Sequence, residues 1–198
     1  MKKIINTTTV FAFILVLLFC SCGNKTTKTK TPVADIDSVK MVLVQLEDST
    51  SKTWQVMIEE DDQKIAYLKR LIDEVAFTRI YDKAVYDSLS AGIESLKAIR
   101  YNQSSMSESE KIDDYDKATA EIVNKVIVFA QGHPNFEDYP LMEELINDIL
   151  ETDNRVIYRR VDYDIIATEY NKFIESHKDI IRKSGNTASA KPLFQLSE

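Results

Sequence analysis

Apolar residues in the C-terminal half of the chain recur at the spacing of one face of a long helix. The segment from Leu141 to His177 contains no proline or glycine. Steps of seven and of three or four separate its apolar positions, which are Met142, Leu145, Ile149, Val156, Tyr163, Ile166, Tyr170 and Phe173. At 3.6 residues per turn this spacing places one apolar stripe along a helix of roughly ten turns. Because a one-sided helix of this length is not stable alone in water, the stripe predicts other helices that cover it.

Segments upstream carry the same periodicity and predict three more helices. The first begins at Asp35 or Asp37, either of which can cap a helix, and keeps a coiled-coil-like spacing as far as Phe77. Its apolar positions are Leu43, Leu46, Trp54, Met57, Leu68, Leu71, Ile72 and Val75. The pattern weakens at residues 48–53 and 59–64. Because valine, threonine and tryptophan favour strands, a β-hairpin over residues 41–58 is an alternative.

A serine-rich break from Tyr101 to Ser109 separates the second predicted helix from the third. The second stripe consists of Tyr81, Val85, Leu89, Ile93, Leu96 and Ile99, with Gly92 inside it. The third helix starts at Ser109, and its stripe consists of Ile112, Tyr115, Thr119, Ile122, Val126 and Phe129. Gly132 and Pro134 end this helix, because glycine is a common C-terminal cap and proline cannot continue it. Pro140 fits the first turn of the last helix.

Four amphipathic helices joined by short links predict an all-α fold. The arrangement that suits them is an antiparallel up-and-down bundle of four long helices. We assign the bundle to residues 37–183, with the last helix continuing past His177 to about Lys183. Residues 184–198 form a loose C-terminal tail, in which Phe194 either packs back on the bundle or belongs to a disordered end.

The first 22 residues have the pattern of a lipoprotein signal peptide. Two lysines start the segment, an apolar run from Val10 to Phe19 follows, and Ser21 precedes Cys22. The run is too short to span a bilayer comfortably, which takes about twenty residues. A small residue before a cysteine resembles a bacterial lipoprotein box, so we expect lipidation of Cys22. An ordinary cleaved signal and an uncleaved anchor helix are the alternatives.

The anchor and the segment after it predict the location of the domain and limit its chemistry. Residues 23–36 are polar and largely aperiodic, as in a flexible tether. We therefore expect a domain outside the cytoplasm, in the bacterial cell envelope, held at the membrane by an acylated N-terminus. Both cysteines, Cys20 and Cys22, lie in the signal peptide. The bundle consequently has no cysteine for a disulfide, a zinc site or a nucleophile.

Composition argues against nucleic acid as a partner and against catalysis. The formal net charge is −7, and no basic face with interleaved aromatic residues occurs. The chain has no glycine-rich phosphate loop, nucleophile elbow or histidine-based triad, and we expect neither an enzyme nor a cofactor. His133 and His177 have no second ligand at metal spacing. The acidic groups at residues 59–62 and 113–114 are better explained as solvated helix faces than as calcium sites.

Polar and aromatic residues of the last helix follow a specific order after Pro134. They are Thr152, Asn154-Arg155-Val156, Arg160, Asp162-Tyr163 and Glu169-Tyr170-Asn171. This order resembles the T-E-N-R-I … R-D-Y-N … E-Y-N pattern of the LemA family of bacterial envelope proteins, without a gap. Trp54, Leu71-Ile72-Asp73 and Val75 resemble the first long helix of that family. The resemblance covers about residues 40–177, and it implies a membrane-tethered helical bundle that faces away from the cytoplasm but no particular reaction.

The chain departs from the family pattern in three respects. The family usually has a pair of arginines and a tyrosine-aspartate step before an I-P-N-L-V segment. Here the corresponding positions read Gln63 to Ala66 and then Leu68 to Ile72, without the proline. His177 stands where the family usually has a proline. Most relatives also have an uncleaved N-terminal anchor helix in place of a lipoprotein signal.

Charged residues of the last helix line one flank of its apolar stripe. Arg155, Asp162 and Glu169 are spaced by seven and form a column, which we interpret as ion pairs that fix the helix register. Arg159 lies within the predicted stripe itself. Because a buried arginine is costly unless it is paired, we expect an acidic partner for Arg159, either Glu60 or Asp61.

Two functions fit these features. The first is a non-enzymatic interaction scaffold or adaptor, tethered to the membrane, that binds another envelope protein of unknown identity. The alternative is a bundle that binds a small ligand or peptide in a pocket around Arg155, Arg160 and Tyr163. The candidate binding residues are Asn154, Arg155, Arg160, Asp162, Tyr163, Tyr170 and Asn171.

Overall fold

The computed structural model describes residues 35–194. It divides the chain into two units, Met1–Val33 and Ala34–Glu198, and the described residues belong to the second. The predicted signal peptide, Cys22 and nearly all of the tether therefore lie outside the described residues.

The described part of the chain is all-α, as the sequence predicts, and contains no strand between residues 35 and 194. In chain order the elements are α1 (Ile36–Phe77), α2 (Lys83–Ile99), the 3₁₀ turn η1 (Ser105–Ser107), α3 (Ser109–Gln131), the 3₁₀ turn η2 (Phe136–Asp138), α4 (Pro140–Ser176) and α5 (Lys178–Lys183). The alternative of a β-hairpin over residues 41–58 is wrong, because α1 runs unbroken through this segment. Thr50 and Thr53 are accommodated in α1 because their hydroxyls donate to Leu46 O and Ser49 O, at 2.7 and 3.1 Å.

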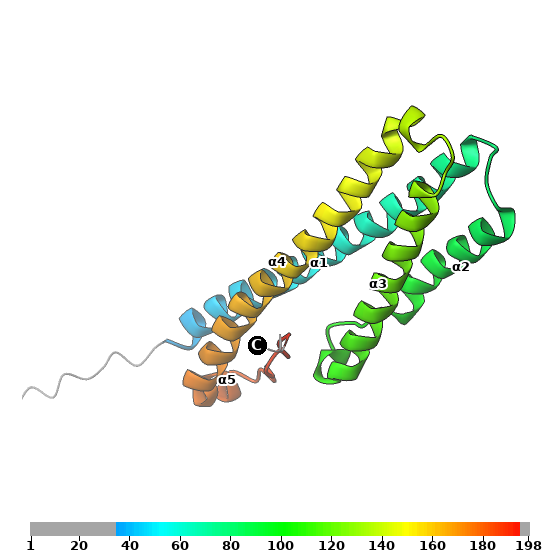
Figure 1. Ribbon diagram of the computed structural model, residues 1–198. Helices are drawn as coiled ribbons and strands as arrows, with labels where there is room; N and C mark the ends of the chain where they lie inside the picture. The colour runs from blue at the N-terminus through cyan, green and yellow to red at the C-terminus, as the bar shows by residue number, and fades with distance from the viewer. Residues whose placement is uncertain (1–34, 195–198) are drawn as a thin grey trace, which may run out of the picture. The chain divides into compact units, whose positions relative to one another are not determined.

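The two long helices, α1 and α4, pack side by side, and the shorter pair α2 and α3 lies against one half of them (Figure 1). At 1.5 Å per residue, α1 is roughly 63 Å long but α3 only roughly 35 Å. The remaining half of the α1–α4 pair is accompanied by α5 and by the segment that follows it. The four-helix bundle is thus complete only at one end.

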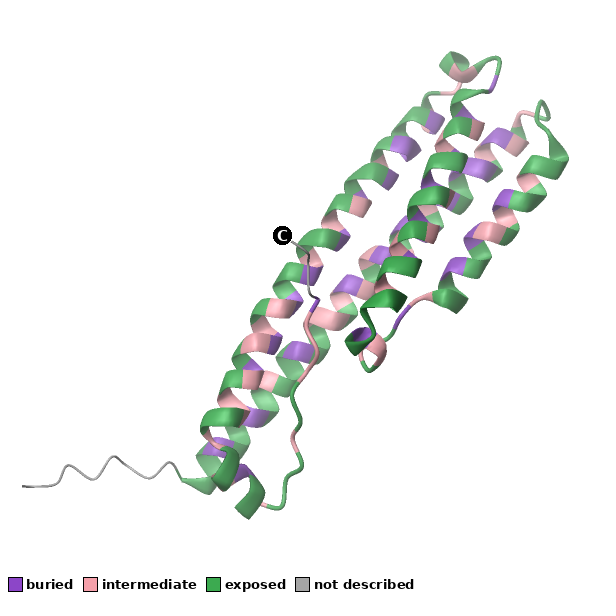
Figure 2. Cartoon of the chain, turned by 60° about the horizontal axis from the view of Figure 1, so that its bottom comes forward, coloured by how far each residue is buried: buried purple, intermediate pink, exposed green. Residues whose placement is uncertain are grey.

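The hydrophobic core follows this division. A large cluster lies between all four long helices, and a small one joins Val39, Leu43, Tyr170 and Ile181 where α1, α4 and α5 meet. Figure 2 shows buried residues along the facing sides of the helices and exposed residues on the outer sides. Ile181 reaches the small cluster because the chain turns between α4 and α5, at His177.

Two predicted helix ends differ from the observed ones. Tyr81, the first residue of the second predicted stripe, precedes the helix, which begins at Lys83 because the Asp82 carboxylate accepts hydrogen bonds from the amides of Ala84 and Val85, at 2.8 and 3.2 Å. The last long helix does not continue to Lys183. It ends at Ser176, and His177 leaves the helical conformation at φ −116° and ψ 16°.

Gly92 marks a close approach between α2 and α3. A Cβ atom built on Gly92 would lie 2.5 Å from Cδ1 of Ile122. We predict that Gly92→Ala raises the free energy of unfolding by less than the about 1 kcal/mol that alanine gains over glycine in a helix, because Ile122 must turn away. Valine lacks Cδ1, so the full gain should be measured in an Ile122→Val background. Urea denaturation of the four chains tests this, and an equal gain in both backgrounds would contradict it.

Candidate functional site

The surface of α4 divides into three faces. One face packs on the core and consists of Met142, Leu145, Ile146, Ile149, Thr152, Val156, Arg160, Tyr163, Ala167 and Tyr170. A second flank carries charges that meet α1. A third is apolar and exposed, with Leu150, Ile157, Tyr158, Val161 and Ile165.

The charged flank is an ion-pair network that includes Arg155 and Asp162 of the predicted column, but Glu169, its third member, forms no ion pair with the described residues. Arg155 Nε donates to Glu60 of α1 at 2.9 Å, and Nη1 to Glu151 at 2.7 Å. The predicted partner of Arg159 is confirmed, because its Nη2 lies 3.5 Å from Glu60 and its Nη1 lies 3.2 Å from Asp162. The side chain of Arg159 is nevertheless 38% exposed, so the prediction that it sits within the buried stripe is wrong.

Arg160 is the arginine that lies in the buried face. Its side chain is 8% exposed and forms a two-point pair with Asp116 of α3, at 2.7 and 2.6 Å. The guanidinium also lies over two aromatic rings, with its central carbon 5.7 Å from the centre of Tyr101 and 5.2 Å from that of Phe194. Burial lowers the pKa of Arg160, but the Asp116 carboxylate and Tyr101 outweigh it and the net shift is upward.

Buried charges on α1 connect that helix to the three others. The carboxylate of Asp61 accepts a short hydrogen bond from Tyr115 of α3 and a 3.0 Å bond from Arg100, which follows α2. Lys64 lies 3.2 Å from Asp61 and donates to Asp153 of α4 at 2.9 Å. Because both Asp61 and Lys64 are almost fully buried, the helices can pack only in the register that pairs them.

Phe194, near the end of the described chain, fills an aromatic box between α1 and α4. Its ring stacks on Trp54, with centres 6.2 Å apart, and meets the edges of Tyr101 and Tyr163, each at 5.7 Å. Arg160 closes the box. Phe194 is only 4% exposed, so of the two alternatives for the tail the one in which Phe194 packs back on the bundle is observed. We call this site the Phe194 box, formed by Trp54, Tyr101, Arg160 and Tyr163.

The backbone leading to Phe194 is held by side chains of α4. Asn171 makes a two-point contact with Lys191, accepting from its amide at 2.7 Å and donating to its carbonyl at 2.8 Å. The Tyr163 hydroxyl lies 3.2 Å from the carbonyl of Pro192, and Asp164 accepts from the amide of Phe194 at 2.8 Å. Residues 185–194 lack regular secondary structure, as a loose tail would, yet their last four residues are fixed at both ends.

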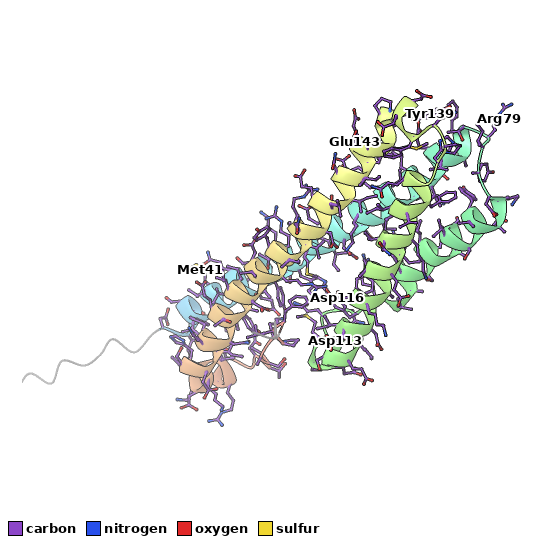
Figure 3. All side chains as sticks on the ribbon, in the orientation of Figure 1. Met41, Arg79, Asp113, Asp116, Tyr139 and Glu143 are labelled. Carbon is purple, nitrogen blue, oxygen red and sulfur yellow. The ribbon has the colours of Figure 1, made fainter. Side chains whose placement is uncertain are left out.

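Cavities border this segment. One of about 440 Å³ lies on the α3 side and is lined by Asp113, Asp116, Arg160 and Phe194, among others. Another of about 720 Å³ lies on the outer side of α4, between Val161, Lys172 and Phe194. Figure 3 shows Asp113 and Asp116 on the half of α3 nearest the C-terminal segment. We call the groove that holds residues 191–194, formed by the Phe194 box together with Asp164, Tyr170 and Asn171, the trough, and these two hollows flank it.

The predicted site residues separate into two groups. Arg160, Tyr163 and Asn171 come together around residues 191–194, and Tyr170 lies beneath the Lys191 ammonium, 5.2 Å from it. Asn154, Arg155 and Asp162 do not reach this place. Arg155 and Arg160 are five residues apart, roughly 140° around the helix, so the expected pocket around both arginines is not formed.

Sequence reasoning missed Trp54, Tyr101, Asp164 and Phe194 as members of the site. The Asp164–Asn171 pair was detectable, because two short polar side chains seven residues apart share one side of a helix. The partners from α1 and from the α2–α3 loop were not, since only the tertiary fold brings them to α4.

His133 makes structural contacts through both ring nitrogens. His133 is buried and its Nδ1 accepts from the Asn135 amide at 3.2 Å. Its Nε2 is therefore the protonated nitrogen, and it donates to the Thr78 hydroxyl at 2.9 Å. This bond joins the α3–α4 turn to the end of α1. Among residues 35–194, no group of three histidine, cysteine or acidic side chains could hold a metal ion.

Arg160 makes one prediction about stability. Arg160→Ala leaves Asp116 without its partner and removes the cation from the Phe194 box. Because Asp116 is partly exposed, the expected loss in free energy of unfolding is about 2–3 kcal/mol, below the range for a fully buried pair. Arg160→Lys should recover less than half, since lysine lacks the planar two-point geometry. Chemical denaturation measures both, and full recovery by lysine would contradict the role of that geometry.

Tyr101 predicts a loss of stability at alkaline pH. Burial raises the pKa of Tyr101 to about 12 and outweighs the lowering by Arg160. Above pH 10 the unfolded chain loses this proton and the folded chain keeps it. The free energy of unfolding should therefore fall by up to about 1.4 kcal/mol per pH unit between pH 10 and 12 from this group alone. Urea titrations should show that this free energy falls less steeply with pH in Tyr101→Phe than in the unaltered chain. The exposed control Tyr158→Phe should show the same fall as the unaltered chain.

Comparison with known proteins identifies the family. No curated protein and no solved structure matches the chain. Within residues 35–194, no helix is both long and apolar enough to cross a bilayer. The family model described as LemA family matches residues 62–198, which include Lys64 and the rest of α1 beyond Asp61, the helices α2, α3 and α4, and residues 191–194. The chain belongs to the LemA family.

Proposed function

We propose that this protein is a non-enzymatic docking scaffold of the bacterial envelope, tethered by a lipid on Cys22, which binds a helix of another envelope protein along α4. The binding surface is the exposed apolar flank of α4, formed by Leu150, Ile157, Tyr158, Val161 and Ile165. The family supports an envelope helical protein, and the tether and the docking role are our proposals.

The apolar flank is the observation that carries the proposal. Its five side chains are between 41% and 69% exposed, although four are aliphatic residues that normally favour the interior. Leu150, Ile157, Val161 and Ile165 are separated by steps of seven, four and four, with Tyr158 beside Ile157, so the five form a continuous stripe on one side of the helix. No described element covers them. A stripe with helical spacing fits a partner helix that lays its own apolar face along α4.

The charges beside the flank define the chemistry of that partner. Asp153 and Asp164 border one edge of the stripe, and Glu151, Asp162 and Glu169 border the other. The side chains of Glu151 and Asp162 are well exposed, and the whole chain carries a net charge of −7. The complementary partner is an amphipathic helix whose apolar face is flanked by lysine or arginine.

Crosslinking in cells tests this proposal. A photo-crosslinking amino acid at Tyr158 should give one repeatable adduct with another envelope protein, joined through a helix of the stated kind. The same amino acid at Glu121, on the exposed side of α3, is the matched control and should give no such adduct. Mass spectrometry of the crosslinked peptide identifies the segment of the partner.

Two variants make the test decisive. Ile157→Asp with Val161→Asp should abolish the Tyr158 adduct without lowering the amount of folded protein, because both side chains are already exposed. Cys22→Ser should move the protein from the membrane fraction to the soluble fraction. The same adducts from positions 158 and 121, or an adduct only with lipid or with a second copy of this chain, would overturn the scaffold proposal.

A further inference from the structure

Residues 191–194 lie in the bundle as a bound peptide lies in its receptor. Four hydrogen bonds run from side chains of α4 to the backbone of the segment, with Asn171 at Lys191, Tyr163 at Pro192 and Asp164 at Phe194. Side chains that contact backbone groups fix the path of an extended chain without regard to its sequence. Two side chains of the segment make specific contacts of their own. The Lys191 ammonium and the Phe194 ring each lie in a site whose residues match that group.

The site for Phe194 is an aromatic box, and the site for Lys191 is a cation site. Phe194 is enclosed by Trp54, Tyr101 and Tyr163, with Arg160 over its ring. The ammonium of Lys191 lies 5.2 Å from the centre of the Tyr170 ring and 3.5 Å from the carboxylate of Glu47. The trough thus selects a cation and, three residues later, an aromatic ring.

The segment can leave the trough without unfolding a helix. Residues 185–190 connect it to α5 without regular structure, and Gly185 has a φ of 77° that favours glycine. Hollows of about 440 and 720 Å³ lie on its two sides, so the segment is not enclosed by protein there. A covalently linked occupant has an effective concentration on the order of millimolar, and a free peptide must compete with it.

We propose that this trough is a peptide-binding site for an extended segment of another protein, with a basic residue followed three positions later by an aromatic one. Residues 191–194 are its intramolecular occupant, which such a segment replaces. The inference rests on the contacts of residues 191–194 and does not depend on the apolar flank of α4.

Trp54 provides a direct readout, because it is the only tryptophan of the chain and stacks on Phe194. The probe is a peptide of residues 187–194 with a C-terminal amide, titrated into the full chain in mild detergent. Phe194→Ala empties the box, and we expect saturable binding that changes Trp54 fluorescence. The unaltered chain should bind the peptide at least tenfold more weakly, since its own segment competes.

Matched variants separate the proposed recognition from adhesion to an apolar surface. A peptide with alanine in place of the phenylalanine should not bind, and one with alanine in place of the lysine should bind severalfold more weakly. In the Phe194→Ala chain, Asn171→Ala should weaken binding about tenfold. Asn147→Ala, at an exposed asparagine of the same helix, should leave it unchanged.

Circular dichroism establishes that each variant is folded. Should Phe194→Ala unfold, Phe194→Leu keeps an apolar side chain in the box, and it should still bind the peptide more tightly than the unaltered chain. Absence of binding to a folded Phe194→Ala or Phe194→Leu chain would overturn the proposal. So would equal affinity for the unaltered and the emptied chain, or equal binding of the phenylalanine and alanine peptides.

Discussion

The pairing of α1 with α4 is the constraint on which the rest of the molecule depends. Each helix carries an apolar stripe too long to be stable in water, and each covers the stripe of the other. The partners α2 and α3 are much shorter, so they complete the core along only half of that pair. The other half must be covered by different means. The turn at His177, which brings Ile181 inward, and the insertion of Phe194 both serve that purpose.

Charged groups inside the bundle determine how the paired helices are aligned. A purely apolar interface would tolerate a shift of one helix along the other at modest cost. Asp61 and Lys64 oppose such a shift, because Asp61 would lose Tyr115 if α3 moved by a turn and Lys64 would lose Asp153 if α4 did, so that each buried charge would keep fewer partners. Arg160 does the same between α4 and α3. Hydrogen bonds from Tyr115 and Arg100 to Asp61, and from Arg160 to Asp116, offset part of the cost of burying these charges in this register.

The three faces of α4 separate structure from recognition. The core face and the charged flank of α4 are covered by contacts with α1 and α3. The apolar flank and the trough of residues 191–194 are left, and they lie next to each other, since Val161 and Phe194 line the same cavity. With both proposed surfaces bordering α4, a partner helix and an extended peptide would lie side by side on the protein. Neither use requires a reactive group.

The sequence by itself determined the helices, their approximate ends and the family, because hydrophobic period, capping residues and proline positions are local signals. It also indicated that Arg159 would meet an acidic residue of α1, Glu60 or Asp61, and Glu60 is the one observed. It misplaced Arg159 and Ile166 in the core. On a helix of 3.6 residues per turn, positions seven residues apart differ by about 20° around the axis, so a stripe predicted from seven-residue steps drifts off the buried face. Over four such steps the face rotates, and Arg160 and Ala167 enter it instead. Only the tertiary structure decided that Phe194 meets Trp54, since residues 140 positions apart share no local signal and are joined by packing alone.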